Sequence, residues 1–119
     1  MTHADEIRKA VATHSLWKSR LRQAIDSGRS QWTVEEVAAA DQCELGRWLE
    51  SVEAAGDDAA RVERIRDLHR KFHREAAQVL QLAHGGQHGV ANMAMAAGSP
   101  FDRLTNELTR ELMLWSRAA

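Results

Sequence analysis

Apolar residues recur at spacings of three and four along most of the chain, which is the period of an α-helix that buries one face. The first stripe lies within residues 3–27 and consists of Ile7, Val11, His14, Trp17, Leu21 and Ile25. A second stripe lies within residues 57–84 and consists of Val62, Ile65, His69, Phe72, Ala76, Val79 and Ala83. A third, towards the end of the sequence, consists of Phe101, Leu104, Leu108, Leu112 and Trp115. These stripes predict three long helices, each with one buried face.

Turn and capping residues separate the stripes. Gly28 predicts the end of the first helix. Thr33, followed three residues later by Glu36, is typical of a capping box, which predicts a short helical turn before the next long element. A second helix is predicted near residues 42–55. The extra turn therefore lies between the first two long helices.

The C-terminal third of the chain contains two further helical segments. One is predicted near residues 88–97, after the glycine pair at 85–86. The last helix is predicted to begin at Ser99 and Pro100, because serine caps helices and proline suits a first helical position. The sequence leaves open whether residues 88–117 form one kinked helix or two. Long helical pieces joined by short turns predict an all-α fold, an antiparallel four-helix bundle with that short extra helical turn.

Composition narrows the class of protein. A chain of 119 residues predicts one domain, residues 1–119, with a single core. A formal net charge of −1 gives no reason to expect nucleic acid or an anionic membrane surface as a partner. No apolar run approaches the roughly 18 residues of a membrane-spanning helix. One cysteine, Cys43, excludes an internal disulfide framework and favours a reducing, cytoplasmic location.

Basic residues gather within residues 61–74: Arg61, Arg64, Arg66, Arg70, Lys71 and Arg74. They surround most of a helix and alternate with the acidic residues Glu63, Asp67 and Glu75. Mixed charges of this kind are typical of a solvated helix surface, which is the interpretation we adopt.

The stretch "DLHRKFHREAAQ" places His69 and His73 four residues apart, near the buried face of the third long helix. Side chains at this spacing stack on one side of a helix and can direct two ring nitrogens at one point. An unpaired polar side chain in a core costs on the order of 1–3 kcal/mol. Together with His14 on the first stripe, the pair needs a shared partner, and a zinc ion is one that satisfies all three imidazoles. A histidine pair alone is also compatible with an ordinary core.

Zinc binds four ligands in its structural sites, and "DQCELGRWL" supplies a candidate for the fourth. We expect Cys43 in the first turn of the second helix, where the helix dipole favours the thiolate. Gly46, nearly one turn further on, would let a neighbouring helix or a metal site approach closely. A small buried hydrophobic residue is the alternative interpretation of Cys43.

Three spaced motifs resemble the chemoreceptor zinc-binding (CZB) family of bacterial regulatory domains. They are "HSL" from His14, "CELGRW" from Cys43 and "HRKFH" from His69, and the resemblance covers about residues 8–117. It implies a four-helix fold in which His14, Cys43, His69 and His73 bind one Zn²⁺ ion.

The resemblance also implies a sensory function. Members of the family respond to zinc, and some respond to hypochlorous acid through the ligand cysteine, which makes Cys43 a redox-reactive residue. The implied partners are a second copy of the chain, as a homodimer, and a chemoreceptor or diguanylate cyclase signalling module with a chemotaxis or cyclic-di-GMP output. Neither module is part of the 119 residues.

Three other interpretations of the histidines and the cysteine compete with a zinc sensor. A zinc enzyme is disfavoured, because four protein ligands leave no open position and "HRKFH" lacks the glutamate of the metalloprotease motif. A di-iron bundle needs inward-facing Glu-x-x-His pairs, and no acidic residue precedes His14, His69 or His73 by three positions. Haem would need a large apolar cavity. A metal-free structural or dimerisation bundle remains the alternative function.

Overall fold

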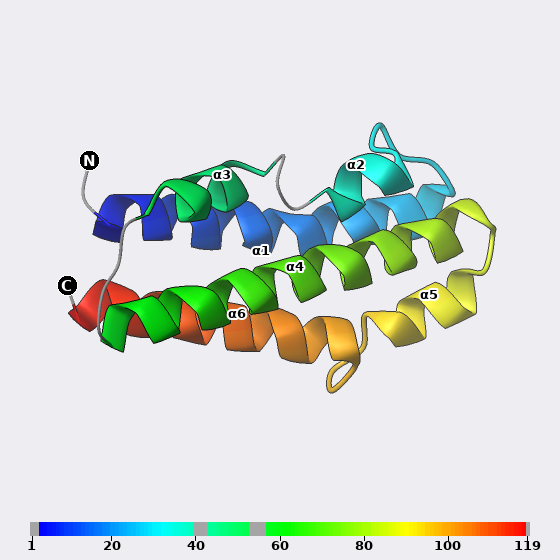
Figure 1. Ribbon diagram of the computed structural model, residues 1–119. Helices are drawn as coiled ribbons and strands as arrows, with labels where there is room; N and C mark the ends of the chain where they lie inside the picture. The colour runs from blue at the N-terminus through cyan, green and yellow to red at the C-terminus, as the bar shows by residue number, and fades with distance from the viewer. Residues whose placement is uncertain (1–2, 40–42, 53–56, 119) are drawn as a thin grey trace.

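The computed structural model describes residues 3–39, 43–52 and 57–118, and within these ranges its regular secondary structure is α-helix, without strands (Figure 1). There are six helices in the described ranges: α1 (His3–Ser27), α2 (Val34–Ala38), α3 (Glu44–Ser51), α4 (Asp57–His84), α5 (His88–Ala94) and α6 (Pro100–Ala118). The predicted all-α class is therefore confirmed. The segment 88–117, left open by the sequence, forms two helices.

The three long helices α1, α4 and α6 pack against one another and form an elongated molecule of 46 × 26 × 19 Å. Figure 1 shows that α1 and α4 run in the same direction and that α6 runs back towards the end where both termini lie. The chain returns from the end of α1 to the start of α4 through the short helices α2 and α3. The arrangement as an antiparallel four-helix bundle stays a prediction, since two short helices occupy the return segment.

The helix boundaries follow the local chemistry of the sequence. Gly28 ends α1 with φ of +71°, a conformation that a residue with a side chain rarely adopts. The Thr33 hydroxyl accepts a hydrogen bond from the Glu36 backbone N–H at 3.1 Å, and the Glu36 carboxylate accepts one from the Thr33 N–H at 2.9 Å. The predicted capping box is thus confirmed. At α6, the Ser99 hydroxyl accepts a hydrogen bond from the Asp102 N–H at 3.2 Å, directly before Pro100.

The second helix is shorter than predicted. The sequence predicted residues 42–55, whereas α3 spans Glu44–Ser51, and residues 42 and 53–55 lie outside the described part of the chain. Cys43 is the N-cap residue of α3 and not a member of its first turn, so that expectation was wrong by one residue. The cause is local, because Cys43 has extended backbone angles, φ −76° and ψ 142°.

The apolar stripes form one continuous core. Its largest fully buried hydrophobic side chains come from all three long helices and from α3: Trp115, Phe72, Phe101, Ile7, Leu21, Ile25, Leu49, Ile65, Leu80, Leu108 and Leu112. Trp17 packs on Trp32, with ring centroids 5.3 Å apart, and Trp115 packs on Trp48 at 5.2 Å. Trp32 precedes α2 and Trp48 belongs to α3, so both partners lie in the segment that connects α1 to α4. The core therefore extends beneath this segment.

Leu112 and Leu114 on α6 offer a matched test of this core. Leu112 is 1% exposed and Leu114 is 40% exposed. We expect Leu112→Ala to lower the free energy of unfolding by about 2–5 kcal/mol, because it removes buried methyl groups and leaves a cavity. Leu114→Ala should lower it by about 1 kcal/mol or less. Urea denaturation measures both, and equal losses would contradict the burial of the α6 stripe.

Candidate metal centre

Four potential metal ligands converge where α1, α3 and α4 meet. His14 comes from the middle of α1, His69 and His73 from consecutive turns of α4, and Cys43 from the N-cap of α3. One ligand atom from each side chain lies within 4.8 Å of all the others. The three histidines are buried and Cys43 is half-buried. The structure thus brings together all four residues that the sequence singled out.

The spacing of the ligand atoms suits a small tetrahedral ion. The Nε2 atoms of His69 and His73 are 2.9 Å apart, and the Cys43 Sγ lies 3.8 Å from the His14 Nε2. A tetrahedral zinc ion, with its usual bond lengths to nitrogen and sulfur, would hold such atoms roughly 3.3–3.6 Å apart. The observed separations lie on either side of this range. Small side-chain rotations would therefore suffice to place the four atoms around one ion.

Two of the histidines are held by backbone carbonyls. The His14 Nδ1 lies 2.7 Å from the carbonyl oxygen of Ala10, one turn earlier on α1. The His73 Nδ1 lies 2.8 Å from the carbonyl oxygen of Val37 on α2. A carbonyl only accepts, so each Nδ1 carries the proton and each Nε2 presents a lone pair to the cluster. Metal-binding histidines are commonly oriented by such outer hydrogen bonds.

The carbonyl of Val37 is the functional group that sequence reasoning missed. The capping box at Thr33 predicted the turn that contains Val37, and the buried side chain of Val37 explains why α2 lies against α4. Nothing in the sequence identifies which carbonyl of α2 meets His73, because a backbone oxygen has no residue-type signature. The short extra turn therefore helps to build the site.

Burial keeps the imidazoles neutral. Desolvation lowers the pKa of His14 to about 4, against a smaller opposite effect of its hydrogen bond to Ala10. Desolvation, together with the neighbouring His73 and His14, lowers the pKa of His69 to about 2. Desolvation also lowers the pKa of His73, opposed by its bond to Val37. Neutral imidazole is the form that binds metal ions.

Cys43 is the most accessible member of the cluster. It adjoins a cavity of about 20 Å³ that is also lined by His14, Lys9 and Glu44. Above it, the Lys9 Nζ lies 3.1 Å from a carboxylate oxygen of Glu44, which links α1 to α3. The space accommodates roughly one water-sized molecule. Small reagents can therefore reach the sulfur from this side.

The other described histidines do not join the cluster. His84 at the end of α4 and His88 at the start of α5 are both exposed. They repeat the spacing of His69 and His73, but Gly85 and Gly86 separate the two helices, as expected. Phe72, between the two ligand histidines in sequence, is buried and packs on His14 with ring centroids 5.0 Å apart. It belongs to the core, as predicted.

Fold and site together define an all-helical domain built around a buried cluster of three histidines and one cysteine. The family described as the chemoreceptor zinc-binding domain matches residues 14–80, more than half of the chain and a range that includes all four cluster residues. The chain belongs to this family. Comparison with curated proteins and with solved structures finds no match. No helix in the described part of the chain is long and apolar enough to cross a membrane.

The lowered histidine pKa values predict how pH affects the metal-free protein. The unfolded chain has histidines with pKa near 6.5, so between pH 7.5 and 5 it binds protons that the folded chain does not bind. Stability is therefore fully present above about pH 6.5 and falls as the pH drops. For His14 alone the loss at pH 5 is about 2 kcal/mol. Urea denaturation in the presence of a chelator measures it, and a constant free energy of unfolding would contradict neutral burial.

Proposed function

We propose that the chain is a zinc-binding regulatory domain in which His14, Cys43, His69 and His73 hold one Zn²⁺ ion. The observation that carries the proposal is the convergence of four ligand atoms within 4.8 Å in a core that contains no other polar cluster among the described residues. Three imidazole nitrogens and one thiolate are a ligand set that zinc prefers. The family's description supports the choice of metal.

Each side chain has a definite part in the proposed site. His14 and His73 present Nε2 lone pairs that the carbonyls of Ala10 and Val37 orient. His69 presents its Nε2 towards that of His73. Cys43 supplies the negative charge that partly neutralises the cation. Bound zinc would link α1, α3 and α4, so metal binding would contribute directly to the stability of the fold.

A structural zinc site is favoured over a catalytic one. Four protein ligands complete a tetrahedron and leave no position for a water molecule or a substrate. No carboxylate belongs to the cluster among the residues described, which argues against a di-iron centre. The metal-free bundle remains the alternative, and it requires the neutral imidazoles to be satisfied by the hydrogen bonds already described.

The regulatory part of the proposal concerns Cys43. Hypochlorous acid would convert its thiolate to a sulfenic acid, with chloride as the reduced product, and would weaken one of the four bonds to zinc. The element freed by this change would be α3, which has only eight residues and is anchored in the core by Leu45 and Leu49. The exposed ion pair between Glu44 of α3 and Lys9 of α1 contributes little to the stability of this position. Besides these leucines, α3 is held by the packing of Trp48 on Trp115 and by the hydrogen bond from Arg66 to the Leu49 carbonyl. A short helix that loses its metal bond while it keeps these contacts is suited to a switch between two positions.

The proposed setting is a cytoplasmic signalling protein. A change in α3 would pass to a chemoreceptor or diguanylate cyclase module, with a chemotaxis or cyclic-di-GMP output, and the domain would act as a homodimer. The family's description as a chemoreceptor domain supports a chemoreceptor as the partner.

Zinc binding is tested by metal analysis of the purified protein. We expect one zinc per chain, and for Cys43→Ala an affinity lower by more than about tenfold, since three histidines remain. The matched control is the double variant His84→Ala/His88→Ala, which removes a histidine pair of the same spacing outside the cluster. Elemental analysis after dialysis and competition with a chromophoric chelator provide the two readouts. An unchanged zinc affinity in Cys43→Ala, or loss of zinc by the control, would contradict the assignment.

Redox sensing is tested on the zinc-loaded protein. We expect treatment with one equivalent of hypochlorous acid to oxidise Cys43 and to release zinc at the same rate, because the sulfur is both reactive group and ligand. Mass spectrometry of the intact chain and a zinc-sensitive dye follow the two events. Oxidation without zinc release, or modification of methionine alone, would contradict the redox half of the proposal and leave zinc binding untouched.

A further inference from the structure

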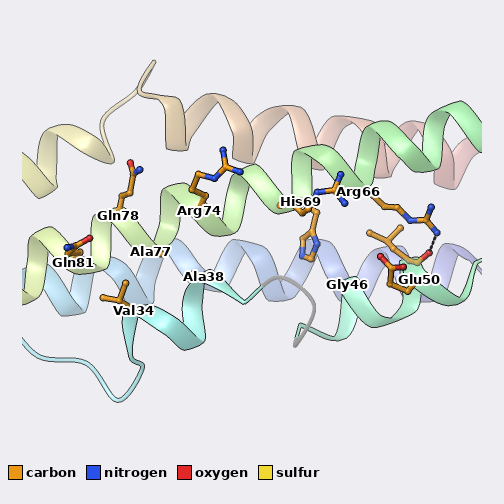
Figure 2. Close-up of a pocket in the computed structure, with 12 residues that line it drawn as sticks. Val34, Ala38, Gly46, Glu50, Arg66, His69, Arg74, Ala77, Gln78 and Gln81 are labelled. Atoms are coloured by element: carbon orange, nitrogen blue, oxygen red, sulfur yellow. Dashed lines mark hydrogen bonds between the residues drawn. The ribbon is translucent and has the colours of Figure 1, made fainter.

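A cleft of about 520 Å³ adjoins the candidate metal centre, with His69 in common, and lies between α4 on one side and α2 and α3 on the other. It exists because the return segment consists of two short helices that leave part of α4 uncovered. Figure 2 shows Val34 projecting from α2 towards α4, and His69 pointing from α4 towards the gap between α2 and α3. A volume of this size is within the usual range for small-molecule sites, roughly 300–1,000 Å³.

The walls of the cleft are apolar near the helices and basic at the edge. Val34 and Ala38 of α2, Leu49 of α3 and Ala77 of α4 supply the apolar part. The basic part comes from three arginines of α4 at positions 66, 70 and 74, one turn apart and therefore on one face. They span about 12 Å along the helix axis. An apolar interior with a few charged groups is the usual make-up of a ligand site.

The basic residues around the cleft differ in what they contact. Arg66 donates hydrogen bonds to the Glu63 carboxylate and to the Leu49 carbonyl, and Lys71 pairs with Asp67 at 2.9 Å. Arg64 pairs with Glu111 across to α6 at 3.3 Å.

Arg70 and Arg74 lie on the row that lines the cleft, are exposed, and form no ion pair with any described residue. The carboxylate of Glu50 lines the opposite end of the cleft, near Arg66 (Figure 2). The Asp67 carboxylate interacts electrostatically with Arg70 and Arg74 but is paired with Lys71. An anion is therefore favoured near Arg70 and Arg74 over the end of the cleft near Glu50. Both arginine side chains are exposed, as the interpretation of the cluster as solvated surface predicts.

We propose that the cleft binds a small organic anion, whose carboxylate or phosphate group contacts Arg70 and Arg74 and whose apolar body packs between α2 and α4. Guanidinium groups bind both kinds of oxyanion through paired hydrogen bonds, so they do not by themselves distinguish the two. A bare inorganic ion would leave the apolar walls of the cleft without a contact, so the proposed ligand also has an apolar body. The cleft shares His69 with the proposed zinc site, but Arg70 and Arg74 are not zinc ligands, so variants of the two arginines test anion binding separately from zinc binding.

The test is a titration of the full chain followed by ¹H–¹⁵N correlation spectra. Octanoate and octyl phosphate are the two anionic probes, and they distinguish the carboxylate from the phosphate. We expect at least one of them to shift the amides of Ala38, Gly46 and Ala77 saturably, with an affinity at least tenfold above those of octanol and inorganic phosphate. Equal binding of octanol, or shifts confined to other regions, would overturn the proposal. Tighter binding of a hexaglutamate peptide would overturn the assignment to a small molecule.

A pair of charge-matched variants separates the site from general electrostatics. Arg70→Gln/Arg74→Gln removes two positive charges from the cleft, and Arg103→Gln/Arg110→Gln removes two from the exposed face of α6. All four side chains are exposed, and the same spectra report whether each variant is folded. We expect the first variant to lose at least tenfold in affinity for the preferred anion and the second to lose less than twofold. Equal losses would show that net charge, and not the cleft, attracts the probe.

Discussion

The fold depends on satisfying three imidazoles and one thiol inside a helical core. Each buried polar group left without a partner would cost on the order of 1–3 kcal/mol, a large share of the stability of a small domain. The chain meets this cost by bringing the groups together and by anchoring two of the rings to backbone carbonyls. The four side chains come from α1, α3 and α4 and meet within one small volume, so their contacts link these three helices.

The return segment between α1 and α4 has more than a connecting role. Its first helix, α2, has five residues and would not be stable alone, yet the capping box and the buried Val37 hold it against α4. In that position its carbonyl orients His73. Trp32 before α2 and Trp48 in α3 pack on Trp17 and Trp115 and close the core on this side. Packing of the segment and orientation of the ligands are therefore linked.

The same segment explains why the metal centre and the cleft adjoin. A continuous second helix would cover α4 along its length, whereas two short helices leave the uncovered face that carries Arg70 and Arg74. His69 belongs to both places, since it lines the cleft (Figure 2) and its Nε2 lies 2.9 Å from that of His73. The same turns of α4 thus carry the buried His69 and His73 on one face and the exposed Arg70 and Arg74 on an adjacent face.

The sequence by itself determined the helices and the identity of the cluster. Apolar periodicity, the capping box and the glycine at position 28 act over a few residues. The types and spacing of His14, Cys43, His69 and His73 indicated that these residues bind one common metal ion. Tertiary structure alone decided the partners of these groups: the carbonyl of Val37, the pairing of each tryptophan, the N-cap position of Cys43 and the cleft beside Arg70. The physical reason is that backbone oxygens carry no residue signature, and that a contact between helices depends on which faces pack together.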